Sequence, residues 1–561
     1  MNAVTALHPH CDHVTGKPQQ PSLALTYHRL MLVMLVFAGV TLLIVGRLAY
    51  LGLFTDRAVA VAGNPLLPAR GDIVDRNGVP LARTIDAWSI AVHPKKLLGD
   101  PAELAAKLAE LMPERSEAEY RRILTMDKNF VYLSRRAMPE LVAAVNALGE
   151  PAIAFDREPE RLYPQTALAA HILGWTDMDG HGVAGMERIL EERLSDAGAR
   201  GRPAMLSIDS RVQAAMESEL AAAMAKHSAE GGAGLVMDVK TGELIALASF
   251  PTFNPNAAGK SPPDAQYNRA TMGVYELGSV FKPLTVAAAI EAGVITNLSR
   301  RLDASNGVAI GRFRISDFKG ENRALTIPEL LVYSSNIATA RVADEMGTER
   351  MQAAFRKLGF HEPVHIELAE KSRPLWPAEW SRATVLTSGY GHGVAITPLH
   401  LASAYAALVN GGIWRPATLM KRDAAPQGRR VYSEETSRKM RQMLRLVVMH
   451  GSGKKGGAEG YRVGGKTGTA EKTSASGYSR KVNVSTFASA FPMDDPRYVV
   501  IAMLDAPRAT ADTYGYTTAG WTAAPIVSKV IARTGPLLGV IPSATRDIDV
   551  SALLPLVKIK S

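Results

Sequence analysis

Residues 207–250 read SIDSRVQAAMESELAAAMAKHSAEGGAGLVMDVKTGELIALASF, and this stretch decides the fold class. Up to His227 it has helical periodicity and an alanine-rich composition. Residues 233–238 and 243–249 are strand-like, and the Lys-Thr-Gly at 240–242 supplies a turn between them. A helix followed by an antiparallel hairpin indicates an α+β fold. Two further segments are expected to extend this sheet and one to close it as a helix: residues 484–491, 498–504 and 524–534.

An apolar segment lies near the N-terminus. Residues 30–46, LMLVMLVFAGVTLLIVG, form a 17-residue run without charge between Arg29 and Arg47, which is just long enough to cross a bilayer. The small residues that could mark signal-peptide cleavage come about a dozen positions later, which favours an uncleaved anchor. We therefore predict a single transmembrane anchor at 30–54 after an N-terminal tail, 1–29. Flanking basic residues are balanced and do not fix its orientation.

The region between the anchor and the α+β segment predicts a support domain at 60–205. Around residues 70–84, RGDIVDRNGVPLART places a short apolar run, Ile73 and Val74, before an Asn77-Gly78 turn, which indicates a hairpin. Helix-like runs follow, and no nucleophile lies beside a candidate base. The helix-like runs are 102–111, 138–148 and 186–194. The chemistry is therefore expected in a domain at 206–540, with 541–561 as a C-terminal tail.

Composition excludes several classes of protein. The chain has 561 residues, 47% hydrophobic and 21% charged, which is typical of globular domains. Its net charge of +10 comes from scattered Lys and Arg rather than a cluster, and does not predict nucleic-acid binding. The single cysteine, Cys11, permits no intrachain disulfide. His8, His10 and His13 surround it among prolines, a pattern that predicts a disordered tail rather than a metal site.

The sequence Ser-x-x-Lys occurs three times, at 279–282, 316–319 and 452–455. A hydroxyl and an amine at i and i+3 face one another only if the segment is helical. Ser279 and Lys282 precede the helix-forming stretch PLTVAAAIEAG, and Ser279 would lie at the helix N-terminus, where developing negative charge is stabilised. The copy at 316–319 runs into Gly320 with no helix-forming stretch after it, and the copy at 452–455 lies in a glycine-rich loop. Both are interpreted as surface loops.

Two more short motifs follow in a fixed order. Ser-x-Asn occurs once, as Ser334 and Asn336, and on its own Ser334 is equally well explained as a helix cap. Lys-Thr-Gly recurs at 466–468 within GGKTGTA, where small residues let a backbone approach a ligand closely. Each motif alone is weak, but the ordered set Ser-x-x-Lys, Ser-x-Asn and Lys-Thr-Gly is typical of penicillin-recognising serine enzymes.

With these motifs the chain resembles a class B penicillin-binding protein. The resemblance implies a penicillin-binding/serine β-lactamase-like transpeptidase domain, an antiparallel sheet flanked by helices, preceded by one transmembrane helix and an elongated support (pedestal) domain. It extends to other segments: Tyr275 to Gly278, Gly391-His392-Gly393, Thr397-Pro398-Leu399, Arg70-Gly71-Asp72-Ile73 and Arg161-Leu162-Tyr163-Pro164. Residues 174–187, GWTDMDGHGVAGME, are more similar to the septal, division-specific branch. Leu277 and the loop 451–460 depart from the family pattern.

The resemblance also implies residue roles. Lys282 would take the proton of the nucleophile Ser279, helped by the charge of Lys466, and Ser334 would relay a proton to the leaving D-alanine. Asn336 would hold the donor amide, while Thr467, Gly468 and Thr469 would bind the carboxylate end. Backbone N–H groups of Ser279 and Thr469 would form the oxyanion hole. No metal or cofactor is implied.

The same resemblance implies partners and location. We expect peptidoglycan stem peptides as substrates, β-lactams as covalent inhibitors, and a membrane-embedded glycan polymerase with other division proteins as partners. The N-terminus would be cytoplasmic and the catalytic domain periplasmic, on the bacterial inner membrane at the septum. The alternatives are an elongation-specific transpeptidase or a D,D-carboxypeptidase or β-lactamase that uses water where a transpeptidase uses an amine.

Overall fold

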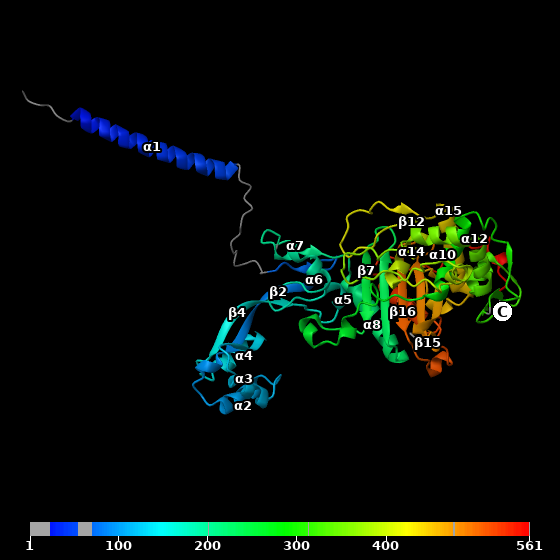
Figure 1. Ribbon diagram of the computed structural model, residues 1–561, viewed down its shortest axis with the longest axis horizontal. Helices are drawn as coiled ribbons and strands as arrows, with labels where there is room; N and C mark the ends of the chain where they lie inside the picture. The colour runs from blue at the N-terminus through cyan, green and yellow to red at the C-terminus, as the bar shows by residue number, and fades with distance from the viewer. Residues whose placement is uncertain (1–22, 54–69, 200, 312, 475–476, 560–561) are drawn as a thin grey trace, which may run out of the picture. The chain divides into compact units, whose positions relative to one another are not determined.

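The architecture comes from a computed structural model that describes residues 23–53, 70–199, 201–311, 313–474 and 477–559 (Figure 1). The chain divides into two units, Met1–Ala62 and Gly63–Ser561, each described by itself. The histidine and cysteine tract of the N-terminal tail lies outside the described residues.

The first unit contains one long helix, α1 (Leu23–Leu53). Its window Leu30–Arg47 has a mean hydropathy of 2.4, and none of that window is buried. At 1.5 Å per residue, these 18 residues extend about 27 Å, close to the thickness of a bilayer's hydrocarbon core. The helix therefore has the length and composition of a membrane anchor.

A five-stranded sheet organises the support region. Its longest strand, β2 (Pro80–Val92), pairs antiparallel with three others: β1 (Ile73–Val74), β3 (Val131–Ala137) and β4 (Ile153–Leu162). On its other side β1 runs parallel to β5 (Ala204–Met205). The predicted hairpin is confirmed, because Ile73 pairs with Ala82 across a turn that includes Gly78 at φ +86°.

Short helices pack on this sheet and around its end. Three of them share a hydrophobic cluster with β2 and β3: α2 (Pro101–Leu111), α3 (Glu117–Leu124) and α4 (Pro139–Asn146). The helix predicted at 186–194 is instead two, α6 (Gly185–Ile189) and α7 (Glu191–Ser195). The helix divides because Leu190, between them, has φ −96° and ψ 13°. A single turn, α5 (Ala170–Leu173), precedes them.

A second five-stranded sheet, entirely antiparallel, is the centre of the C-terminal region. Its order is β14-β15-β16-β6-β7, which leaves β14 at one edge. The strands are β6 (Gly231–Asp238), β7 (Leu244–Phe250), β14 (Gly464–Ser474), β15 (Gly477–Phe491) and β16 (Tyr498–Asp505). The predicted hairpin and both later strands are therefore confirmed within one sheet.

Helices cover both faces of this sheet. Alternate residues of β16 enter different cores: Val500 and Leu504 share one with α8 (Ser210–His227) and α16 (Ala523–Thr534), whereas Ile501 belongs to the other, with α14 (Pro398–Val409). Because side chains of a strand alternate between faces, burial on both sides requires an uninterrupted apolar strand. The sequence YVVIAMLD meets that requirement, and α8 lies along the sheet in Figure 1.

Four more helices complete the second core: α10 (Lys282–Glu291), α11 (Ile327–Val332), α12 (Asn336–Lys357) and α15 (Glu434–His450). Smaller elements join them. These are α9 (Pro263–Gln266), α13 (Arg382–Ser388), the pairs β8 (Arg301–Asp303) with β11 (Ala324–Thr326), β9 (Val308–Ile310) with β10 (Phe313–Ile315), and β12 (Ile413–Trp414) with β13 (Arg429–Arg430).

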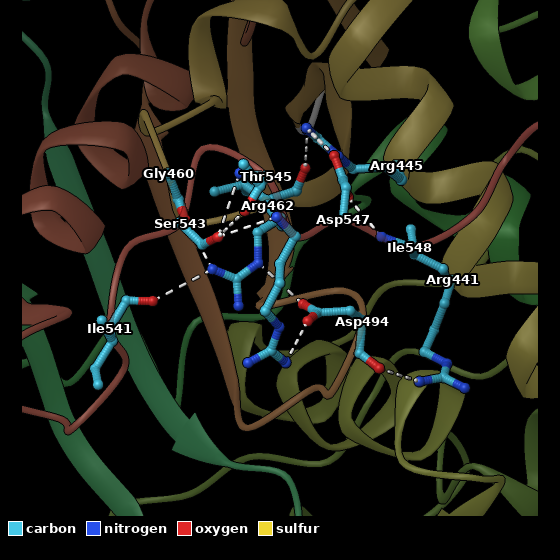
Figure 2. Close-up of polar contacts among 12 residues, drawn as sticks. Arg441, Arg445, Gly460, Arg462, Asp494, Ile541, Ser543, Thr545, Asp547 and Ile548 are labelled. Atoms are coloured by element: carbon cyan, nitrogen blue, oxygen red, sulfur yellow. Dashed lines mark hydrogen bonds and ion pairs between the residues drawn. The ribbon is translucent and has the colours of Figure 1, made fainter.

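Ion pairs and backbone hydrogen bonds join the segment after residue 540 to the rest of the C-terminal region (Figure 2). Arg445 on α15 donates to both carboxylate oxygens of Asp547 at 2.6–3.0 Å, and Asp494 accepts from Arg462 and from Arg546. Further on, Val550 enters the core, and Thr326 donates to the carbonyl of Leu556 at 2.7 Å. Residues 541–559, which the sequence alone suggests are a tail, are thus part of the packed region.

Candidate active site

A cavity of about 750 Å³ lies beside the edge strand β14. Of the residues singled out in the sequence, Ser279, Ser334, Asn336, Thr467 and Thr469 line it. Lys282 and Lys466 are fully buried beside them, each with 0% exposure. A second cavity of about 780 Å³ is lined mainly by the support region. No residue of the Ser-x-x-Lys, Ser-x-Asn or Lys-Thr-Gly motifs is in its lining. The residues that carry the chemistry therefore identify the β14 cavity as the candidate site.

Ser279 lies in a 3₁₀ turn, η3 (Gly278–Phe281), that leads directly into α10. In a 3₁₀ helix residues i and i+3 lie one above the other, which aligns Ser279 with Lys282. Pro283 follows in the first turn of α10, where its missing N–H removes no helical hydrogen bond. The turn also leaves its first N–H groups without helical acceptors.

Glycines allow this turn to touch β14. Gly278 has φ +60°, and a Cβ placed there would meet the carbonyl oxygen of Thr469 at 2.8 Å. A Cβ on Gly468 would meet the carbonyl oxygen of Leu277 at 2.3 Å. The sequence predicted a close approach to a ligand at this glycine, and the structure shows that a backbone segment is the close neighbour.

Ser334 joins the two buried lysines. Its Oγ accepts hydrogen bonds from Lys466 Nζ at 2.9 Å and from Lys282 Nζ at 3.1 Å, and its carbonyl also accepts from Lys282. Ser279 lines the same cavity, but its hydroxyl makes no hydrogen bond to any residue that the structure describes. The three motifs thus meet at Ser334, although up to 187 positions separate them in the sequence, from 279 to 466.

The backbone of Ser334 is unusual for a residue with a side chain. Its φ of +58° lies in the left-handed region, which is unfavourable by roughly 1 kcal/mol or more for an L-residue. The helix cap is the next residue: Ser335 Oγ accepts from Ala338 N at 3.0 Å and donates to Asp317 at 2.7 Å. Ser334 is therefore not the cap of α12, and its hydroxyl remains directed at the lysines.

Burial alters the charge state of both lysines. It lowers the pKa of Lys466 from 10.5 to about 7. It lowers the pKa of Lys282 well below 10.5, and the neighbouring Lys466 charge acts in the same direction. Desolvation disfavours the ammonium form, and two ammonium groups bound to one serine also repel each other. An amine able to accept a proton near neutral pH is therefore available beside Ser279.

The other predicted residues hold the walls of the cavity. Asn336, the first residue of α12, donates from Nδ2 to the carbonyl of Ser316 at 3.0 Å. The hydroxyls of Thr467 and Ser452 are 2.6 Å apart, and Thr469 Oγ1 accepts from the backbone N–H of Ala519 at 3.1 Å. The strand thus presents alternating threonines, 467 and 469, to the cavity.

Two loops lie at the rim of the cavity. The segments 316–319 and 452–455 are largely exposed, as the sequence predicted for surface loops. Each also contributes residues to the cavity lining, which was not predicted: Asp317, Phe318, Lys319, Ser452, Lys454 and Lys455. Asp317 accepts from the Ile337 N–H at 3.0 Å in addition to its bond with Ser335. No sequence pattern in these loops indicated that they would border the cavity.

Further lining residues lie outside the three catalytic motifs. Gly515, Tyr516, Thr517, Thr518, Gly520 and Trp521 follow β16, while Glu471 and Asn483 come from β14 and β15. His392 also lines the cavity, and burial lowers its pKa. Only His392, within Gly-His-Gly, was noted in the sequence. Short-range periodicity does not predict that the loop after β16 lies beside the cavity.

Comparisons with known proteins agree with this site. The family model for the Penicillin binding protein transpeptidase domain matches residues 232–532, and that for the Penicillin-binding Protein dimerisation domain matches residues 65–202. The chain therefore belongs to the class B penicillin-binding proteins. The motifs had predicted this family.

Relatives within the family refine the likeness. The chain is 40% identical to the probable peptidoglycan D,D-transpeptidase FtsI of Caulobacter vibrioides, over 84% of this chain and 82% of the relative. It is 28% identical to the peptidoglycan D,D-transpeptidase FtsI of Escherichia coli K12, over 90% and 91%. The crystal structure of penicillin-binding protein 3 from Mycobacterium tuberculosis with aztreonam covers 86% of this chain and 99% of its own, with 26% identity and a TM-score of 0.67.

Proposed function

We propose that this protein is a membrane-anchored peptidoglycan D,D-transpeptidase of septal cell-wall synthesis, with Ser279 as its nucleophile. The observation that carries the proposal is the convergence of Lys282 and Lys466 on Ser334 in the cavity that Ser279 lines. The 40% identity with the FtsI protein of Caulobacter vibrioides supports the septal branch.

Acylation begins with the hydroxyl of Ser279. The Lys282 amine, whose pKa is lowered by burial and by the Lys466 charge, takes the serine proton as the oxygen attacks the carbonyl of the donor stem peptide's D-Ala–D-Ala bond. Lys282 Nζ donates to Ser334 in this structure, so the amine must turn toward Ser279 for the proton transfer. Such bonds often tighten only when substrate is bound.

The developing oxyanion is stabilised by backbone groups. The N–H of Ser279 lies in the first turn of η3, and Thr469 lies on β14, at an edge of the sheet. Gly278 and Gly468 bring these two backbones into contact. Ser334 then relays a proton to the departing D-alanine, and an amine from a second stem peptide resolves the acyl-enzyme.

The remaining polar residues position the donor peptide. Asn336 holds a peptide amide, while Thr467 and Thr469 bind the terminal carboxylate, which the nearby Lys466 charge also attracts. The same contacts place the carboxylate of a β-lactam, which explains inhibition by covalent capture of Ser279. Neither a metal nor an organic cofactor takes part in this chemistry.

The anchor and support region suggest how the enzyme is deployed. α1 crosses the inner membrane once, with the N-terminus cytoplasmic and the second unit periplasmic. A membrane-embedded glycan polymerase and other division proteins are the proposed partners, contacted through α1 and the support region. Depletion of the protein is expected to give filamentous cells, whereas rounded cells would assign it to elongation.

Covalent labelling tests the chemistry. Ser279→Ala should abolish labelling by a fluorescent penicillin and leave the thermal unfolding temperature close to that of the parent. Ser316→Ala is the matched control, since Ser316 has the same spacing to a lysine but does not line the cavity, and it should retain labelling. Labelling that persists in Ser279→Ala overturns the assignment. Rapid loss of the penicillin adduct in a mass time course would favour a β-lactamase.

A further inference from the structure

A buried tyrosine on α14 is bonded to the turn that carries Ser279. α14 is buried along its whole length, and Tyr405 is 0% exposed. A phenol hydroxyl in such a core normally has a hydrogen-bond partner. The partner of Tyr405 is not in its own helix, because its hydroxyl donates to the backbone carbonyl of Val280 at 2.8 Å. Val280 directly follows Ser279, so this bond reaches the turn from a segment 125 positions away in the sequence.

The carbonyl of Val280 needs a donor from outside because of a proline. Val280 lies in the 3₁₀ turn η3, and in a 3₁₀ helix each carbonyl accepts from the N–H three positions later. Three positions after Val280 is Pro283, which has no N–H. The proline at the start of α10 therefore leaves an acceptor beside the nucleophile without its 3₁₀ donor. The hydroxyl of Tyr405 supplies that donor.

A second bond from outside the turn holds its other end. The N–H of Gly278, one residue before Ser279, donates to the carbonyl of Gly391 at 3.1 Å. Ser279 thus lies between two anchors, Gly391 and Tyr405, and neither of them lines the cavity. Burial also raises the pKa of Tyr405 well above 10, so its hydroxyl stays protonated and remains a donor throughout the neutral range.

We propose that Tyr405 is a positioning residue for acylation, because its bond to the carbonyl of Val280 sets the orientation of the peptide unit next to Ser279. Tyr405 does not touch the reacting atoms and acts only through the turn. Without the hydroxyl, the buried carbonyl loses its partner, and the turn shifts toward another donor or toward water. The alignment of Ser279 with Lys282 is then lost. This inference rests on the proposed function, since it gives Tyr405 a part in the acylation of Ser279.

Stopped-flow acylation of the full-length protein by a fluorescent penicillin tests this role. Measured up to saturation, it separates the dissociation constant of the first complex from the first-order rate constant of acylation. Tyr405→Phe should lower the rate constant roughly tenfold, less than the ~100-fold that a displacement of about 1 Å costs. The dissociation constant should stay close to that of the parent. Only folded molecules react, so a lower yield of folded protein alters neither constant.

Tyr432→Phe is the control for removing a buried hydroxyl. Tyr432 is also buried, at 2% exposure, but its hydroxyl has no hydrogen-bond partner among the residues that the structure describes. This variant should acylate at the rate of the parent. At position 405, 4-aminophenylalanine should restore the rate, because its amine can donate to the same carbonyl. The analogue 4-methylphenylalanine, which is of similar size but has no donor, should not restore it.

The outcomes separate the positioning role from the proposed function. A rate constant in Tyr405→Phe close to that of the parent would overturn the positioning role. An equal fall in Tyr432→Phe, equal rates with the two phenylalanine analogues, or a change in the dissociation constant alone would also overturn it. Failure of the parent to react with penicillin would instead overturn the proposed function.

Discussion

Replacing Gly468 with alanine places a methyl group against the turn that carries Ser279. Its Cβ would lie 2.3 Å from the carbonyl oxygen of Leu277, whereas real Cβ contacts essentially never fall below 3.0 Å. β14 and η3 must therefore separate by about 0.7 Å, the difference between these two distances. Since misplacing reacting groups by about 1 Å costs on the order of 100-fold in rate, we expect a 10- to 100-fold slower acylation.

Stopped-flow acylation by a fluorescent penicillin measures this effect as a second-order rate constant. Gly259→Ala is the matched control, because a Cβ at Gly259 meets no atom within 4 Å, and its rate should equal that of the parent. Thermal unfolding of both variants shows whether the Gly468→Ala protein is folded. A folded Gly468→Ala protein that reacts within twofold of the parent would refute the role of this close contact in setting the site geometry.

Two further predictions concern the buried lysines. Burial and the Lys466 charge lower the pKa of Lys282, so the amine loses its ability to accept a proton only on acidification. Penicillin acylation should therefore remain fast at pH 7. A pH–rate profile that is still rising at pH 10 would contradict this. The pKa of Lys466 is about 7 in the folded protein, against an ordinary value of 10.5. Between these two pH values the folded protein binds fewer protons than the unfolded chain. Its stability therefore increases as pH rises through this range, by up to about 1.4 kcal/mol per pH unit. In Lys466→Met that gain should vanish, and melting temperatures between pH 7 and 9 that rise equally in both proteins would exclude it.

The sheet of the C-terminal region could be predicted from the sequence because its strands carry their own signal. β6, β7 and β16 are apolar runs bounded by turns, and α8 and α16 have clear helical periodicity. Local patterns of this kind are set by which residues a strand or helix must bury. They also placed Ser279 correctly before a helix. The split of 186–194 into two helices was not predictable, because it depends on the backbone angles of Leu190.

The site itself depends on contacts that no local pattern contains. Ser-x-Asn gave no sign that Ser335 is the cap and that Ser334 adopts a left-handed backbone, because capping is decided by where α12 begins. Likewise, Lys319 and Lys455 are exposed, and from the sequence alone they would be interpreted as solvated charges. Only the folding of their loops against Tyr516 and Trp521 distinguishes them.

The end of the chain helps to hold Ser334 in its unusual conformation. Glu329 on α11, only 2% exposed, accepts from the backbone N–H of Lys558 at 3.0 Å and from both terminal nitrogens of Arg323 at 2.7 and 2.9 Å. These bonds lower its pKa to about 2 even though burial alone would raise it. α11 ends one residue before Tyr333, whose hydroxyl donates to the carbonyl of Lys558. Ser334, with its left-handed backbone, is the next residue in the chain. Contacts from more than two hundred positions away therefore fix the helix that precedes Ser334 and offset the strain of its backbone.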